Sequence, residues 1–206
     1  MKIKFDGHQE YQLDAVGAAV DIFDGQPLAQ GQFEIQLSAS SNEMLSELGF
    51  GNLLRVSDAK LLQNLRAVQS RNGIALSEQL DGSNFSIEME TGTGKTYVYL
   101  RTIFELRHRY GFTKFIIVVP SVAIREGVLK TIELTKQHFA DIYGNVPLDA
   151  WVYDSKQVSR LRQFATSNQL QVLIINIDAF NKPDNNVIHR ENDRLSGRKP
   201  IEFIQA

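Results

Sequence analysis

The stretch METGTGKT, residues 89–96, decides how the sequence around it is interpreted. Its glycines allow a tight turn and let backbone N–H groups converge on an anion. An amphipathic stretch begins at Lys95, so the positive end of a helix would face the same point. Lys95 would reach the outer phosphates of a nucleotide, and the Thr96 hydroxyl could ligate a magnesium ion. The sequence therefore predicts a phosphate-binding loop in which Lys95 and Thr96 are the catalytic residues and Thr96 is the metal ligand.

Other residues of the same loop complete the predicted nucleotide site. The spacing places small or hydroxyl-bearing side chains where backbone must approach phosphate closely. We expect the cofactor-binding loop to comprise Thr91, Gly92, Thr93, Gly94, Lys95 and Thr96.

Downstream of the loop, short apolar runs alternate with helical patterns. This alternation is typical of parallel strands joined by crossover helices. Strands are expected at residues 85–89, 114–119, 149–154 and 171–177. Helices are expected at residues 95–110, after an N-cap at Ser121, and after an N-cap at Ser155. Apolar stripes favour two of these helices: Ile124, Val128 and Ile132 in one, and Val158, Leu161 and Ala165 in the other. The pattern predicts a doubly wound α/β sheet with four strands.

The first 84 residues have a different pattern. Amphipathic helices are predicted at residues 8–23 and 57–71, with a polar loop at 25–52 that holds at most one short strand at 33–37. We interpret residues 1–84 as a mostly helical accessory segment and residues 85–206 as the nucleotide-binding domain. The polar stretch 181–200 is expected to be irregular and mobile.

Composition excludes several classes of protein. The chain is 43% apolar and 22% charged, which is ordinary for a globular domain, and its net charge of −2 says nothing about nucleic acid. It has no cysteine, hence no disulfide or thiolate metal site, and its four histidines lack ligand spacing. The longest apolar runs have the length of strands rather than membrane spans. A cytoplasmic protein without a membrane segment is expected.

Four blocks of the sequence together resemble a known family. Met89 stands where a strict phosphate loop has glycine, and this variant is common in helicase-like motors. METGTGKT, VVPSVAIREGV (118–128), INIDAFNK (175–182) and YQLDAV (11–16) resemble the restriction (Res) subunit of type III restriction enzymes, a branch of the superfamily 2 helicases. The resemblance implies an incomplete RecA-like P-loop NTPase domain, a parallel sheet with helices on both faces, that uses ATP and Mg²⁺.

The resemblance also implies a base contact near the amino terminus. Gln12 matches the glutamine that reads the adenine edge, and an amide suits this role because it both donates and accepts hydrogen bonds. A polar residue on a helix surface is the alternative for Gln12. Phe5 could stack on the base, although a place in the core is the better interpretation.

Three further residues correspond to DNA-contacting positions of the family. Ser121 and Arg125 lie in a block that contacts the DNA backbone, although Ser121 could act as a helix cap alone. Asp178 ends an apolar run that resembles a magnesium-binding Walker B strand. Ala179 follows it instead of a catalytic glutamate, so the resemblance favours a DNA contact for Asp178.

In the full-length protein, the resemblance implies coupling of ATP hydrolysis to translocation on, and cleavage of, double-stranded DNA, together with a modification methyltransferase (Mod) subunit. The Asp-Glu motif of the family is expected beyond Ala206, so weak nucleotide binding without turnover is predicted for these 206 residues. Alternatives are another superfamily 2 helicase or remodeller, or a non-catalytic module that binds DNA or a partner.

Overall fold

The computed structural model describes residues 5–28, 52–180 and 187–205. The chain forms two compact units, each built from separate stretches of sequence. The first comprises Met1–Ala29, Leu53–Gly111 and Leu134–Asn145, and the second comprises Gln30–Asn52, Phe112–Glu133 and Val146–Ala206. The expected domain boundary at residue 84 stays a prediction.

The second unit contains a parallel sheet of three strands. These strands are β1 (Lys114–Val119), β2 (Leu148–Val152) and β3 (Leu170–Asn176), in the order β1-β3-β2. The central strand β3 has the most continuous apolar sequence, and all its residues before Asn176 are buried. A strand covered on both faces requires such a run. Three of the expected strands are thereby confirmed.

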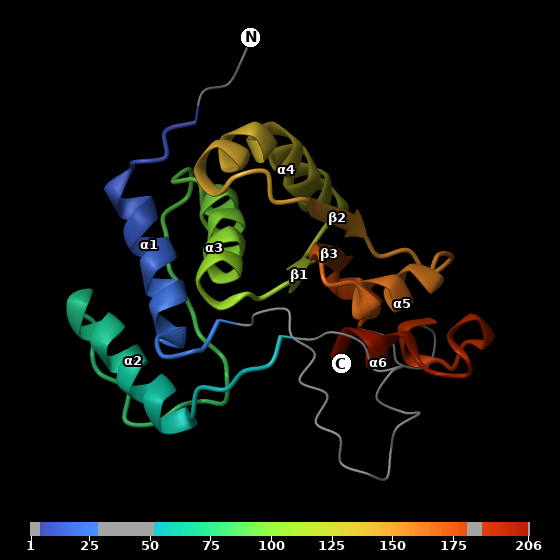
Figure 1. The fold of residues 1–206 in the computed structure, drawn as a ribbon, viewed down its shortest axis with the longest axis horizontal. Coiled ribbons are helices and arrows are strands. Elements are labelled where there is room, and N and C mark those ends of the chain that lie inside the picture. Colours follow the sequence, from blue (N-terminus) through green and yellow to red (C-terminus); the bar gives the residue numbers. More distant parts are fainter. Residues whose placement is uncertain (1–4, 29–51, 181–186, 206) are drawn as a thin grey trace. The chain divides into compact units, whose positions relative to one another are not determined.

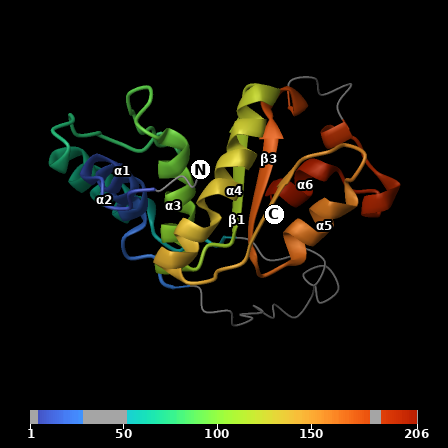
Figure 2. The same ribbon diagram turned by 90° about the horizontal axis from the view of Figure 1, so that it is seen from above.

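Helices cover both faces of this sheet. α4 (Val122–Tyr143) connects β1 to β2, and α5 (Ser159–Thr166) connects β2 to β3. The amino-terminal half of α4 lies on one side of the strands, whereas α5 and α6 (Pro200–Gln205) lie on the other (Figure 2). The core between the sheet and α5 contains Trp151, Val158, Leu161, Phe164, Ala165, Leu173, Leu195 and Phe203. The arrangement confirms a mixed α/β fold.

The first unit is helical. It contains α1 (Glu10–Val20) with the short 3₁₀ helix η1 (Asp21–Phe23), α2 (Asp58–Arg71) and α3 (Lys95–Tyr110). α1 lies alongside α3, and η1 contacts α2 (Figure 1). Ile22, Leu61 and Val68 form the buried centre between η1 and α2. Among the described residues, no helix is both long enough and apolar enough to cross a membrane.

The prediction of a strand at residues 85–89 is wrong. The structure assigns no strand there, and only Phe85 and Met89 of this stretch are partly buried. A strand exists only where its backbone groups pair with a neighbour. Phe85 instead packs against the cluster between η1 and α2.

Two local expectations also differ from the structure. Ile124 of the expected α4 stripe is 49% exposed, whereas Val128 is buried. Ser155 does not cap α5, since Asp154 accepts hydrogen bonds from Lys156 and forms a turn before the helix starts at Ser159. The short strand at 33–37 lies outside the described residues.

The carboxyl-terminal stretch is more ordered than its polar sequence suggests. Residues 187–205 contain two 3₁₀ helices and α6. Ile188, Leu195 and Phe203 are buried, so isolated apolar residues anchor this stretch. The expectation of an irregular segment is wrong for residues 187–200, and the expected mobility stays a prediction.

Candidate phosphate loop and its surroundings

The loop before α3 has the backbone that an anion cradle requires. Gly92 and Gly94 have φ angles of +86° and +87°, a region that side chains other than glycine rarely adopt. Gly94 is also the N-cap of α3, and its carbonyl accepts the first helical hydrogen bond, from Val98 N at 3.0 Å. The first N–H groups of a helix have no acceptor within it, so those of Lys95 and Thr96 are available to an anion.

Gln12 lies against this loop. Its Nε2 donates a hydrogen bond to the Thr93 carbonyl oxygen at 2.9 Å, and its side chain is buried. A Cβ added at Gly94 would lie only 2.7 Å from the same nitrogen. Gln12 is therefore not an ordinary surface residue of α1. Two segments separated by 81 positions form one structure around the loop.

The loop is also fixed from within. Thr93 Oγ1 donates a hydrogen bond to the Glu90 carbonyl oxygen at 2.7 Å, which closes the turn over Thr91 and Gly92. Thr91 and Gly92 are exposed, and nothing lies within 4 Å of a Cβ added at Gly92. The exposed side of the loop therefore leaves room for a ligand close to the backbone.

Lys95 and Thr96 begin α3 as the sequence predicts. Lys95 is exposed and has no hydrogen-bond or ion-pair partner in the part of the chain that the structure describes. Thr96 is half-buried and carries the one aliphatic hydroxyl of the first turn of α3. No group of three His, Asp or Glu side chains suited to a metal ion occurs within the described ranges. Mg²⁺ usually keeps several waters and binds substrate phosphates, so a single threonine oxygen fits its requirements.

An aromatic and polar cluster supports the first turns of α3. The Tyr97 hydroxyl lies 2.8 Å from His138 Nε2, and Arg101 Nη1 donates to the Tyr97 hydroxyl at 3.2 Å. Arg101 Nη1 also donates to the Gly7 carbonyl oxygen at 2.6 Å, which holds the segment before α1. Burial and the nearby Arg101 charge lower the pKa of His138. The Phe5 ring stacks on Tyr97 with centroids 6.1 Å apart, so Phe5 is part of this cluster.

The sequence did not single out Tyr97, Arg101 or His138 as residues around the site. The one available signal was that Arg101 sits six residues after Lys95, in a helix whose neighbouring positions are apolar. An arginine is rarely buried without partners. That rule could have marked it as part of a polar cluster.

Ser121 and Arg125 lie at the start of α4, in the second unit. Ser121 Oγ accepts a hydrogen bond from Ile124 N at 3.3 Å, so it acts as a helix cap. Arg125 Nη2 donates to Glu126 Oε1 at 2.8 Å. This ion pair is on the surface, where such pairs contribute little and exchange readily. The predicted DNA contacts of both residues stay predictions.

Asp178 lies in the 3₁₀ helix η2 (Ile177–Ala179) that follows β3. Its backbone N–H donates to Asn176 Oδ1 at 3.0 Å, and its side chain is exposed. Asn176 therefore caps the turn that ends the strand. Neither the predicted DNA contact of Asp178 nor the Walker B alternative is tested by this geometry.

Comparison with known proteins supports the family that the four blocks suggested. The family model described as "Type III restriction enzyme, res subunit" matches residues 54–202, which is more than half of the chain. The match begins after Gln12 and α1.

Curated relatives give the same result. The chain is 41% identical to the Res subunit of the type III restriction-modification enzyme EcoP15I of Escherichia coli, over 95 residues that are 44% of this chain and 10% of that protein. It is 37% identical to the Res subunit of StyLTI of Salmonella typhimurium, over 143 residues that are 61% of this chain and 14% of that protein. The Res subunit of EcoPI of phage P1 is 39% identical over 95 residues, 44% of this chain and 10% of that protein. The matched regions thus span only a small part of these relatives. A glycine loop at the start of α3, a parallel α/β sheet in the second unit and these matches lead to one conclusion: the chain belongs to the family of type III restriction enzyme Res subunits, in its RecA-like, helicase-like domain.

Proposed function

We propose that this chain is the ATP-binding portion of a type III Res subunit, which in the full-length protein couples ATP hydrolysis to movement along double-stranded DNA and to its cleavage. The observation that carries the proposal is the hydrogen bond from the buried Gln12 amide to Thr93 in the phosphate loop. It supports one site in which a base-reading amide lies next to a phosphate cradle.

The geometry supports a proposed group for each part of ATP. Gln12 Nε2 donates to the Thr93 carbonyl oxygen at 2.9 Å and, over a long 3.4 Å, to the Tyr11 hydroxyl, and its Oε1 has no donor among the described residues. When the long contact with Tyr11 gives way to a base, the amide offers one donor and one acceptor, which match the N7 acceptor and N6 donor of adenine. The exposed Lys95 ammonium and the first N–H groups of α3 would bind the phosphates. The Thr96 hydroxyl would hold Mg²⁺, which neutralises phosphate charge during transfer when it is bound.

Hydrolysis needs groups beyond these. A positioned water and further charge stabilisation are required for phosphoryl transfer. No aspartate in the 206 residues is followed by a glutamate, the pair that would serve as metal ligand and base. We therefore propose that the 206 residues alone bind ATP weakly and do not turn it over. DNA contacts through Ser121, Arg125 and Asp178, and association with a Mod subunit, belong to the same proposal.

A nucleotide-binding titration tests the proposal. Purified residues 1–206 are titrated with a fluorescent ATP analogue in the presence of Mg²⁺, alongside Lys95→Ala and the matched control Lys136→Ala. Lys136 is an exposed helical lysine of the same unit. We expect Lys95→Ala to weaken binding by about tenfold or more, because it removes a charged phosphate ligand, and Lys136→Ala to leave it unchanged. Equal binding by wild type and Lys95→Ala would refute a phosphate site at this loop.

A further inference from the structure

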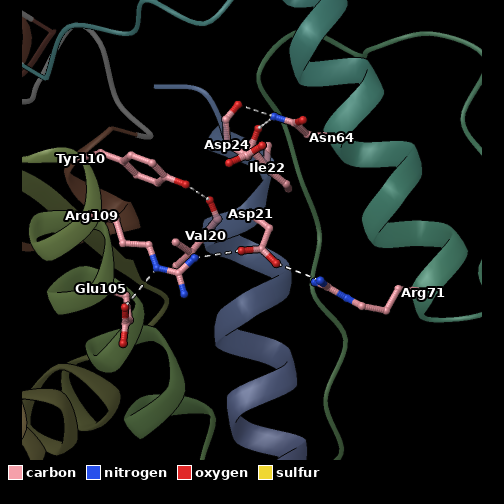
Figure 3. Close-up of polar contacts among 9 residues, drawn as sticks. All are labelled: Val20, Asp21, Ile22, Asp24, Asn64, Arg71, Glu105, Arg109 and Tyr110. Atoms are coloured by element: carbon pink, nitrogen blue, oxygen red, sulfur yellow. Dashed lines mark hydrogen bonds and ion pairs between the residues drawn. The ribbon is translucent and has the colours of Figure 1, made fainter. Parts of the chain in front are cut away.

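One carboxylate connects three helices of the first unit at the end farthest from the phosphate loop. Asp21 Oδ2 pairs with Arg71 Nη1 at 2.9 Å, and Asp21 Oδ1 pairs with Arg109 Nη1 at 3.1 Å (Figure 3). Asp21 follows α1, Arg71 ends α2, and Arg109 lies in the last turn of α3. Arg109 is held from behind by Glu105, 3.4 Å from its Nε. We call Asp21, Arg71 and Arg109 the Asp21 clamp.

The backbone beside the clamp is held as well. The Tyr110 hydroxyl donates to the Val20 carbonyl oxygen at 3.3 Å. Asn64 Nδ2, from the buried face of α2, donates to the carbonyl oxygens of Ile22 at 2.9 Å and Asp24 at 2.8 Å (Figure 3). The last carbonyls of a helix lack partners within it, and here side chains of α2 and α3 satisfy them. The carboxyl end of α1 is therefore fixed in position on both neighbouring helices.

The other end of the same helix carries Gln12. Nine residues separate Gln12 from Asp21, a rise of about 14 Å along α1. The N-cap Gln9 makes no side-chain capping hydrogen bond, so the amino end of α1 is held by contacts with α3, among them Arg101 Nη1 with the Gly7 carbonyl oxygen at 2.6 Å. The position of Gln12 over the loop thus depends on how α1 packs along α3. The Asp21 clamp fixes the carboxyl end of α1 against α3, at the opposite end of α1 from Gln12.

The side chains of the Asp21 clamp are partly exposed, so we expect them to affect the position of α1 more than the stability of the unit. The side chains of Arg71, Arg109 and Asp21 are 54%, 47% and 31% exposed. Ion pairs with this exposure add little to the free energy of unfolding. The two ion-pair distances, from Asp21 to Arg71 and from Asp21 to Arg109, still define where α1 ends relative to α2 and α3. Loss of the clamp should therefore leave this end of α1 held only by Tyr110 and Asn64, so that α1 shifts slightly while the unit stays folded.

We infer that Asp21 is a positioning residue for base recognition: by pairing with Arg71 and Arg109 it seats α1 so that the Gln12 amide meets the base of a nucleotide held by the loop. The inference rests on the proposed nucleotide site and adds to it a device for base selectivity that lies more than two helical turns away. Asp21 itself touches neither base nor phosphate.

The test compares base selectivity with phosphate binding. ATP, GTP and inorganic tripolyphosphate compete with a fluorescent ATP analogue for residues 1–206, for Asp21→Asn, and for the matched control Asp14→Asn. Asp14 is an exposed acid of the same helix, so its substitution makes the same change in charge. Wild type and Asp14→Asn should prefer ATP to GTP. Asp21→Asn should lose about threefold to tenfold of that preference, the effect of one misplaced hydrogen bond, and keep its affinity for tripolyphosphate within twofold. Asp21→Glu, which retains the charge, should recover at least half of the lost preference.

Each other outcome is decisive. If wild type binds tripolyphosphate but does not distinguish ATP from GTP, the base-reading role of Gln12 in the proposed function fails, and the inference fails with it. If wild type prefers ATP and Asp21→Asn keeps that preference, the inference alone is overturned. If Asp21→Asn loses affinity for ATP, GTP and tripolyphosphate in parallel, Asp21 is only a structural residue and the inference is again overturned.

Discussion

Two glycines of the phosphate loop offer a test of the Gln12 contact, because substitutions at them differ only in whether the new side chain meets Gln12. Gly92 and Gly94 have nearly the same backbone angle, φ +86° and +87°. A Cβ at Gly92 meets nothing within 4 Å, whereas a Cβ at Gly94 meets Gln12 Nε2 at 2.7 Å. Gly92→Ala therefore adds backbone strain alone, and Gly94→Ala adds the same strain plus a collision with the Gln12 amide.

The size of the difference follows from what must move. An alanine forced into the left-handed region costs about 1–2 kcal/mol, and this cost applies to both variants. The atom in the way at Gly94 is the end of a flexible side chain, so the Gln12 amide can rotate aside instead of deforming the backbone. Rotation breaks its hydrogen bond to Thr93, a loss of about 1 kcal/mol. Gly94→Ala should thus lower the free energy of unfolding by about 1 kcal/mol more than Gly92→Ala.

Urea unfolding followed by far-UV circular dichroism measures this difference. With a slope of about 2 kcal/mol per molar urea, 1 kcal/mol moves the midpoint by about 0.5 M. Both substitutions are then repeated in a Gln12→Ala background, where the collision no longer exists and the two glycine variants should unfold at the same urea concentration. The reasoning is refuted if Gly92→Ala and Gly94→Ala are equally unstable in the wild-type background, or if their difference persists without Gln12.

Three further predictions concern charge. Burial lowers the pKa of Lys114 to about 8. Between pH 8 and the unfolded pKa of about 10.4 the unfolded chain binds more protons than the folded one, so the free energy of unfolding should rise with pH, by about 1 kcal/mol after allowance for solvent screening of this half-buried group. Lys114→Met should abolish this rise in urea unfolding series between pH 8 and 9.5. Burial also lowers the pKa of His138, so stability should fall as pH drops below about 6.5, the ordinary value, and melting curves of His138→Gln should show a smaller fall. If Arg125 contacts a DNA phosphate, Arg125→Ala should reduce the slope of log affinity against log salt by about 1, as measured by fluorescence anisotropy. Lys130 is an exposed lysine of the same helix, and Lys130→Ala should leave the slope unchanged.

Much of the secondary structure could be predicted because its signals are local. α3 begins and ends at the predicted residues, since Gly94 and Gly111 each supply a left-handed residue at a helix boundary. β1 also has its predicted bounds, and the apolar run at residues 171–177 predicted a strand that the structure has at β3. These features depend on residues within one element and its caps, so no knowledge of the tertiary structure was needed.

The errors arose where the outcome depends on distant residues. Residues 85–89 have a pattern suited to a strand, but Phe85 packs with η1 and α2, and the structure pairs no strand with them. Leu195 stands alone in polar sequence, and Phe203 lies in an apolar segment too short to show a period, yet both complete the core beside α5. Contacts absent from the local sequence decided these two cases. Ser155 is different: it was a reasonable cap by residue type, but its neighbour Asp154 forms the local turn.

The candidate site is built from segments that lie far apart in the sequence, so substitutions in different segments should affect different parts of nucleotide binding. The phosphate-binding groups belong to one continuous stretch before and within α3, whereas Gln12 reaches that stretch from 81 positions away. Local sequence fixes the first group, since glycines and a helix start are sufficient to form the cradle. The position of Gln12 depends instead on the contacts between α1 and α3, including Arg101 with Gly7 at one end and Asp21 with Arg109 at the other. Changes to the phosphate-binding groups of the loop, such as Lys95, should therefore affect every nucleotide alike. Changes that displace Gln12, whether between α1 and α3 or at Gly94, should alter the choice of base.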